Sequence, residues 1–282
     1  MNRSRPSHRQ RLKRHIATAV IVLIGIALIG GSSVSAGRPP AQQRTPQGKG
    51  RFKVAYIPVK NKDYKELQQL VTSERLLEEI ADNLNKTIAL PVDVTLSFGE
   101  CGEANAFYDP EKQRIIFCYE FLVELAETYA PHAKTDDELG TKLSGAIMHI
   151  FFHEIGHALT HVLDLPVTGK EEDAVDQLAT VILVESGEDG EKAVLDASIQ
   201  YLSEYKAQGK NPFTRTQFAD EHSLDPQRFY NLLCWVYGHD ETKYAYLVNK
   251  GYLPKERGAR CADEYEKISK SWGRLLEPYL KD

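Results

Sequence analysis

The stretch from residue 148 to residue 161 constrains the fold more than any other part of the chain. It reads MHIFFHEIGHALTH, with a histidine at every fourth position and with Glu154 as its only acidic or strongly basic residue. Because an α-helix turns once in 3.6 residues, this spacing predicts a helix with four imidazoles along one side. Apart from Glu154, the residues between them are uncharged, so we expect the helix to lie in the interior.

His153 and His157 flank Glu154 in the pattern H-E-x-x-H. Four residues apart on a helix, the two imidazoles can reach one tetrahedral zinc ion at about 2.0–2.1 Å. Glu154 follows the first histidine directly and is placed to take a proton from a zinc-bound water, as in zinc metalloproteases. The sequence therefore predicts one zinc ion per chain, held by His153 and His157, with Glu154 as the general base.

The other two histidines of the stretch, His149 and His161, also have the four-residue spacing of a ligand pair. Neither additional pair has a neighbouring base, so we interpret His149 and His161 as histidines with hydrogen-bond partners near the site. The longer pattern H-E-x-x-H-x-x-G-x-x-H is absent, since Thr160 and Leu163 occupy its glycine and third-histidine positions. This excludes the metzincin class.

A third ligand must come from elsewhere, and three acidic residues stand together at Glu171, Glu172 and Asp173. Glu172 has an acidic neighbour four residues on, Asp176, and borders the apolar face of a predicted helix. Glu171 instead matches a capping box with Thr168, in which the two side chains bond each other's backbone amides. We therefore assign zinc ligation to Glu172, and Asp176 to a hydrogen bond with a ligand histidine. Glu171 and Asp173 remain the alternatives.

The apolar pattern of the remaining chain predicts a small sheet first and helices afterwards. Strands are expected at 52–59, 92–98, 105–108 and 114–119, and helices at 64–88 and from 120 to about 130. Most of the chain beyond them is expected to be helical. The predicted fold class is α+β.

Three motifs resemble the glutamate-type zincins, whose best-known members are thermolysin-like. They are HEIGH at 153–157, EDAVD at 172–176 and NAF at 105–107. The resemblance implies a small mixed β-sheet packed on the H-E-x-x-H helix, followed by a mainly helical C-terminal half. It also implies that Asn105 and Ala106 lie on a substrate-binding edge strand; the alternative is an ordinary hairpin strand.

A closer resemblance covers nearly all of residues 51–282. The motifs NAFYDP, CYE, HEIGHAL, EEDAVDQLA, DEHSLDPQRFYNLLCWVYG and RCADEY are similar to those of a family of exported bacterial metallopeptidase-like proteins. That family implies a zinc hydrolase and supplies no characterised substrate.

Zincins usually stabilise the oxyanion of the tetrahedral intermediate with a Tyr or His from the C-terminal half. His222 and Tyr230 are the candidates for this role. The alternatives are that His222 belongs to a segment that caps the next helix, and that Tyr230 faces the core from that helix.

The N-terminus has the order of an export signal. Residues 1–36 contain six Lys or Arg and no acid, then an apolar run at 16–30 and small residues up to Ala36. The run is short for the roughly 20 residues that span a bilayer, although an uncleaved membrane anchor is the alternative. We expect export to the periplasm or beyond, with membrane contact only through this segment if it stays uncleaved.

The rest of the chain divides into a spacer and one domain. Residues 37–50 lack large apolar side chains and are typical of a flexible linker, and residues 51–282 suit a single metallopeptidase domain. Without the six N-terminal bases, 29 basic residues face 40 acidic ones, a net charge of −11. Such an acidic body argues against nucleic acid as a partner.

Four cysteines in an exported chain predict two disulfide bonds. Cys101 and Cys118 flank a hairpin with its turn at 109–112, and counting outward from that turn places them nearly opposite each other. Cys234 and Cys261 would then connect two C-terminal helices. A zinc site made of cysteines is the rival, but the chain has no C-x-x-C pair.

The predicted function is zinc-dependent hydrolysis of peptide bonds by an endopeptidase outside the cytosol, with a peptide or protein as substrate. The alternative is a binding or assembly protein of the cell envelope that keeps zinc as a structural element and no longer turns over substrate. Both predict bound zinc, and they differ in what the loss of Glu154 would change.

Overall fold

The structure is a computed structural model that describes residues 48–209 and 213–281. The predicted export signal at 1–36 lies outside the described residues, as does most of the predicted linker at 37–50. Within the described ranges, no helix is both long and apolar enough to cross a membrane.

A four-stranded mixed sheet forms the N-terminal part of the fold. Its strands are β1 (Phe52–Tyr56), β2 (Val94–Gly99), β3 (Ala106–Asp109) and β4 (Arg114–Cys118), in the order β1-β2-β4-β3. β2 pairs in parallel with β1 and β4, whereas β3 pairs antiparallel with β4. The α+β class and the mixed sheet are therefore confirmed, and β3 is an edge strand.

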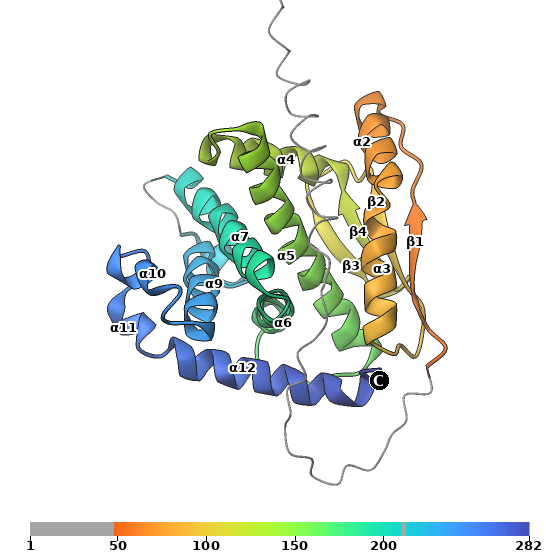
Figure 1. Cartoon of the computed structure of the whole chain (residues 1–282). Helices are drawn as coiled ribbons and strands as arrows, with labels where there is room; N and C mark the ends of the chain where they lie inside the picture. The colour runs from red at the N-terminus through yellow and green to blue at the C-terminus, as the bar shows by residue number, and fades with distance from the viewer. Residues whose placement is uncertain (1–47, 210–212, 282) are drawn as a thin grey trace, which may run out of the picture.

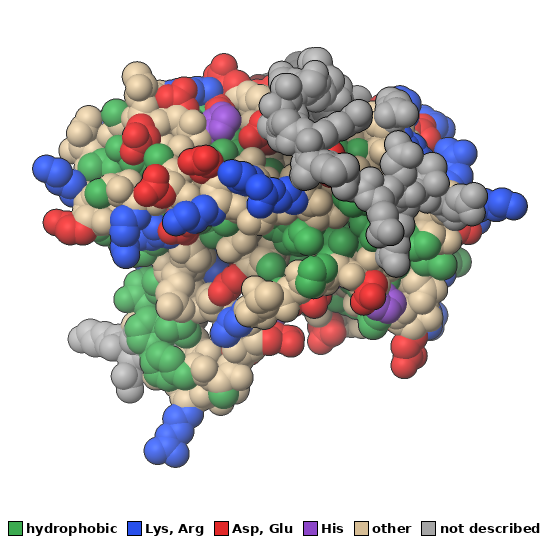
Figure 2. All heavy atoms as spheres, turned by 90° about the horizontal axis from the view of Figure 1, so that it is seen from below, with side chains coloured by type: hydrophobic (Ala, Val, Ile, Leu, Met, Phe, Trp, Pro, Cys, Tyr) green, Lys and Arg blue, Asp and Glu red, His purple; other side chains and the backbone are tan. Residues whose placement is uncertain are grey.

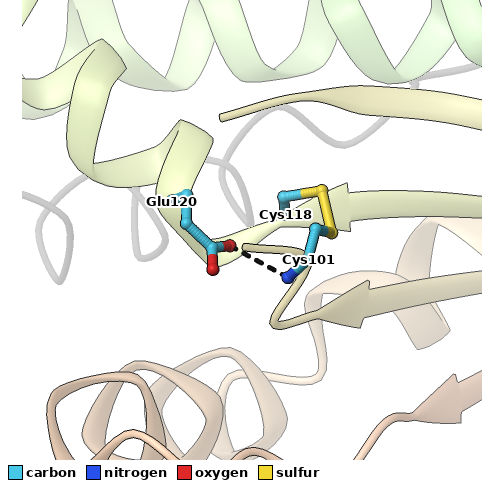
Figure 3. Close-up of side chains that lie close together, drawn as sticks. All are labelled: Cys101, Cys118 and Glu120. Atoms are coloured by element: carbon cyan, nitrogen blue, oxygen red, sulfur yellow. Dashed lines mark hydrogen bonds between the residues drawn. A yellow bond between two sulfur atoms is a disulfide. The ribbon is translucent and has the colours of Figure 1, made fainter. Parts of the chain in front are cut away.

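The hairpin of β3 and β4 carries the first disulfide bond, between Cys101 and Cys118 (Figure 3). The predicted pairing is confirmed, but the expected register is not, because the backbone amide of Cys118 bonds the carbonyl of Asn105. Cys101 reaches Cys118 from the loop before β3. The Glu120 carboxylate holds this loop by accepting the amides of Cys101 and Gly102, at 3.2 and 2.9 Å.

The helices that contact the sheet pack on one of its faces. Tyr56 of β1 bonds Glu78, and its register neighbours Phe98 and Phe117 contact Phe151 from the same face. Helices α2 (Lys62–Ser73) and α3 (Leu76–Thr87) follow β1, and α3 packs on β1 and β2. Helix α4 (Tyr119–Tyr129) continues directly from β4. The 27-residue helix α5 (Asp136–Val162) lies against β3 and β4. It contains the whole 148–161 stretch, and nearly all of that stretch is buried as predicted.

An aromatic cluster joins α5 to the sheet. The Phe151 ring lies 5.0 Å from that of Phe117 on β4 and 5.6 Å from that of Phe98 on β2, between centroids, and all three side chains are fully buried. Burying a side chain of this size stabilises a fold by about 2–3 kcal/mol. This packing fixes α5 beside the edge strand.

The C-terminal half is helical. Its longer helices are α6 (Glu171–Glu185), α7 (Glu188–Ala207), α9 (Asp225–His239) and α12 (Cys261–Leu276), and its short ones are α8 (Arg215–Phe218), α10 (Ala245–Asn249) and α11 (Lys255–Gly258). Helix α5 contacts both α6 and α7, while α12 runs beneath α6 and α9 in the view of Figure 1. The second predicted disulfide bond, Cys234–Cys261, is confirmed and joins α9 to α12.

The surface seen from below carries Lys and Arg side chains interspersed with Asp and Glu (Figure 2). Neither sign of charge covers that face as a continuous field.

Candidate active site and metal centre

A close approach of α5 and α6 builds the site. Gly156, between the two motif histidines, faces Val175 on α6, and a Cβ atom added at Gly156 would lie 2.8 Å from the Val175 Cβ. Only a residue without a side chain lets the two backbones come this near. The first turns of α6 are therefore held against the histidines of α5.

Donor atoms of three residues converge at this contact. His153 Nε2 and His157 Nε2 are 3.3 Å apart, Glu172 Oε2 lies 3.1 Å from His153 Nε2, and Glu172 Oε1 lies 3.3 Å from His157 Nε2. Donors on a tetrahedral zinc at 2.0–2.1 Å would be separated by about 3.3–3.4 Å. The spacing of the three donors matches that of ligands around one ion, and these residues could hold a metal.

Hydrogen bonds at the far side of each ring prepare the histidines as ligands. His153 Nδ1 donates to Asp176 Oδ1 at 2.8 Å, and His157 Nδ1 donates to Glu171 Oε1 at 2.7 Å. A carboxylate only accepts, so each Nδ1 carries a proton, and Nε2 is the ring nitrogen that a metal ion would bind after displacing its proton. Two Nε2 atoms and a carboxylate facing one another fit a cation between them.

The carboxylate of Glu172 is the third group at the site, beside the imidazoles of His153 and His157. Its Oε2 atom is buried without a hydrogen bond. Burial alone would raise the pKa of Glu172, but contacts with the three imidazoles of His153, His157 and His222 outweigh it and hold that pKa well below the usual range. Glu172 is therefore ionised at neutral pH and offers an anionic oxygen to a cation.

Asp176 is itself fixed from behind by Arg228 of α9. The Arg228 guanidinium donates from Nε and Nη2 to the two oxygens of Asp176, both at 2.8 Å, and lies 4.3 Å above the Tyr201 ring. Burial raises the pKa of Asp176, yet the charge of Arg228 and the contact with His153 lower it far more. The carboxylate thus stays ionised and oriented although it is buried.

Glu154 lies between the ligand histidines and the edge strand. Its side chain is buried, and burial raises its pKa above the usual value against the opposing charges of His153 and His157. The backbone amide of Tyr108, on β3, faces this carboxylate and lowers its pKa. The candidate base is therefore oriented by the strand on which a substrate is expected to pair.

The predicted substrate residues lie on the same edge. Ala106 pairs with Phe117 of β4, and Asn105 immediately precedes β3. The Tyr108 hydroxyl is hydrogen-bonded to His161 Nδ1 of α5 at 2.9 Å, which ties the strand to the helix. The structure thus brings Asn105 and Ala106 beside the helix that carries Glu154.

Of the two outer histidines, His161 has the expected hydrogen-bond partner and His149 does not. His149 is fully buried, and neither of its ring nitrogens has a hydrogen-bond partner in the described part of the chain. Burial lowers the pKa of His149 to about 4, so the ring is neutral. The interpretation of His149 as a hydrogen-bonded residue is therefore wrong, because core packing encloses the ring without a hydrogen-bond partner for either nitrogen.

The predicted capping box at Thr168 is also wrong. Helix α6 begins at Glu171, its N-cap is Lys170, and no side chain caps it. Glu171 is therefore the first residue of the helix and not the third. Its carboxylate turns towards α5 and bonds His157, a role that the cap pattern concealed.

The two candidate oxyanion donors, His222 and Tyr230, lie in different surroundings. His222 Nε2 lies 3.0 Å from Glu172 Oε2, and its Nδ1 lies 3.0 Å from Asp220 Oδ1. Tyr230 is 38% exposed and does not face the core. It lines a pocket of about 350 Å³ whose walls include none of the three converging residues; the other lining residues are Asp173, Ser223, Pro226, Gln227, Asn231 and Arg257. The structure places only His222 beside the converging donors.

Sequence reasoning missed Arg228, Tyr108 and Asp220. A signal existed for Arg228, because it stands four and seven residues before Leu232 and Trp235, which are buried on the same face of α9. A charged residue on an apolar face needs a buried partner of opposite sign. Tyr108 acts through its backbone amide, and a backbone donor leaves no trace in residue identity.

Comparison with known families matches residues 56–276 to the family described as "Putative metallopeptidase". No curated protein and no solved structure matches the chain. The match covers most of the chain and contains the converging donors, Glu154 and His222. The chain belongs to this metallopeptidase family, which implies a bound metal and action on peptides or proteins.

Proposed function

We propose that the protein is a zinc-dependent endopeptidase of the glutamate zincin type that acts outside the cytosol. The observation that carries this proposal is the convergence of His153 Nε2, His157 Nε2 and the Glu172 carboxylate within 3.1–3.3 Å, with Glu154 in the same turn of α5. Two imidazoles with one carboxylate form the ligand set of a catalytic zinc, which keeps a position open for water or substrate.

His153, His157 and Glu172 would hold the zinc ion, with Asp176 and Glu171 fixing the two rings. A zinc ion bound there would lower the pKa of a water molecule to about 7 and polarise a substrate carbonyl. Glu154 would take the proton from that water and pass it to the leaving amine. Its raised pKa suits a group that must both accept and return a proton.

A peptide substrate would pair with the free edge of β3. Extended peptides add to exposed sheet edges through backbone hydrogen bonds, and Asn105 and Ala106 would supply part of that edge. His222 Nε2 would donate to the oxyanion that forms on the attacked carbonyl, since it lies beside Glu172. The zincin-like fold and export through residues 1–36 belong to the same proposal.

The deciding experiment is metal analysis of the purified protein together with mapping of cleavage products from a mixed peptide library. Glu154→Gln is the test variant, and Glu127→Gln, at an exposed position on α4, is the matched control. Because the amide keeps the shape and removes the base, Glu154→Gln should retain one zinc and lose about 10²–10⁴-fold in hydrolysis. The control should match the wild type.

Hydrolysis by Glu154→Gln at the wild-type rate would eliminate the mechanism. One bound zinc without any cleavage by the wild type would favour the alternative, an envelope protein that uses the ion as a structural element.

A further inference from the structure

A short segment between α8 and α9, Asp220–Ser223, crosses over the first turn of α6 and carries His222. We call it the strap. In the described part of the chain, no hydrogen bond between backbone atoms involves residues 220, 221 or 223, and His222 bonds only the side chain of Asp220 through its amide. The strap therefore owes its position to contacts with its surroundings.

Side chains from three positions at the start of α6 hold the strap. Lys170 Nζ donates to the backbone carbonyls of Asp220 and His222, each at 3.0 Å. Ser223 Oγ donates to Asp173 Oδ2 at 2.9 Å. The third contact is the one between His222 Nε2 and Glu172 Oε2. Lys170, Glu172 and Asp173 are almost consecutive, so the strap is tied to the segment that presents the ligand carboxylate.

Lys170 is the attachment nearest to His222. Its ammonium group bonds the carbonyl of His222 itself and that of Asp220, whose carboxylate holds the His222 ring at Nδ1. It is the N-cap residue of α6 and makes no side-chain cap there. An ammonium with two carbonyl partners fixes the backbone on both sides of Glu221, and with it the direction of the imidazole.

We propose that Lys170 is a positioning residue: it clamps the strap to the start of α6 so that His222 Nε2 stays directed at Glu172 and at the substrate carbonyl beside it. The consequence for catalysis rests on the proposed function. The clamp itself does not, and it can be tested without substrate or metal.

The first test is hydrogen–deuterium exchange of the full-length protein. Lys170→Met removes the ammonium and keeps the aliphatic stem, and Lys170→Arg restores a charged donor. Lys192→Met, an exposed lysine on α7 paired with Glu188, is the control. The amides of Ala219, His222 and Leu224, which are hydrogen-bonded, should exchange about tenfold faster in Lys170→Met, the factor expected when a hydrogen bond of ordinary strength is lost. The arginine variant and the control should stay near wild type.

Unchanged exchange of this segment in Lys170→Met would overturn the clamp. Faster exchange spread over α5 and α6 would also overturn it, since that result would show general destabilisation.

The second test is a double-mutant cycle on peptide hydrolysis with Lys170→Met and His222→Ala. A residue that acts only through another adds nothing once that other is gone. Lys170→Met should lower kcat about tenfold or more with little change in KM and with full metal content. It should cause no further loss in the His222→Ala background.

Additive losses would overturn the positioning role. If the wild type is inactive and Lys170→Met still speeds exchange in the strap, the proposed function is refuted, while the proposal that Lys170 clamps the strap stands.

Discussion

Three histidines around Glu172 share one arrangement. Each Nδ1 faces its own carboxylate: Asp176 for His153, Glu171 for His157 and Asp220 for His222. The partners differ in burial, because Asp176 lies in the interior while Glu171 and Asp220 are about half exposed. A charge-assisted hydrogen bond is stronger where water is excluded, so we expect the three carboxylates to differ in their effect on the site.

The first prediction at this scale compares Asp176 with Glu171. Asp176→Ala should weaken zinc affinity about 10–100-fold, and Glu171→Ala should weaken it less, within the lower part of that range. Asp176→Ala should also lower the free energy of unfolding by about 3–5 kcal/mol, because it leaves Arg228 buried without a partner. Chelator competition and urea unfolding measure the two quantities. Full zinc affinity in Glu171→Ala would show that its bond to His157 is incidental.

The second prediction concerns pH. Burial lowers the pKa of His157, but Glu172 and Glu171 outweigh it and raise that pKa to about 9 in the metal-free protein. An unfolded chain has a histidine pKa of about 6.5. The stabilisation of the folded metal-free protein by protonated His157 is therefore complete below pH 6.5 and is lost as the pH rises through 9. Urea unfolding of chelator-treated protein should show a decline of up to about 3 kcal/mol over that range.

His157→Gln is the control for this decline, because the amide does not titrate. It should remove most of the pH dependence. A variant that declines as steeply as wild type would assign the effect to another group. With zinc added, the dependence should reverse, since the ion must displace the proton and binds better at higher pH.

At the scale of elements, the contact between α5 and α6 decides whether the donors meet. Gly156→Ala would place a methyl group against Val175, and overpacking of this kind costs about 1–3 kcal/mol. Zinc affinity should fall as well, because the helices must separate. Gly156→Ala combined with Val175→Ala should recover part of both losses. An undiminished zinc affinity in Gly156→Ala would show that the site tolerates a wider gap.

The helices and strands show which features a sequence can reveal. The H-E-x-x-H helix, the hairpin and the β2 strand follow from periodicity, which depends only on neighbours along the chain. The predicted start of α6 is wrong. Thr168 and Glu171 have the spacing of a capping box, but the Glu171 carboxylate bonds His157 of α5 instead of a backbone amide at the helix start. The partnership of Asp176 with Arg228 spans 52 residues, and no local pattern encodes such a distance. The three converging residues and the bond of Asp176 to His153 were accessible from sequence, and the rest of the supporting network was not.

At the scale of the whole molecule, the N-terminal segment remains a prediction. The mature protein should begin near Gly37, because the small residues before it suit signal cleavage after Ala36. N-terminal sequencing of protein from the cell envelope and the medium is the measurement. Intact residues 1–36 on membrane-bound material would favour the anchor. Alanine replacement of the six basic residues at 3, 5, 9, 11, 13 and 14 offers a control, since loss of the basic region should impair export.

The two disulfide bonds connect cysteines in the order in which the chain presents them. Cys101 pairs with the next cysteine, Cys118, across 17 residues, and Cys234 pairs with the next, Cys261, across 27. In a chain that enters an oxidising compartment N-terminus first, each thiol that emerges meets its correct partner before a wrong one is present. Oxidative folding can then proceed with an oxidant alone, without an isomerase to reshuffle mispaired bonds.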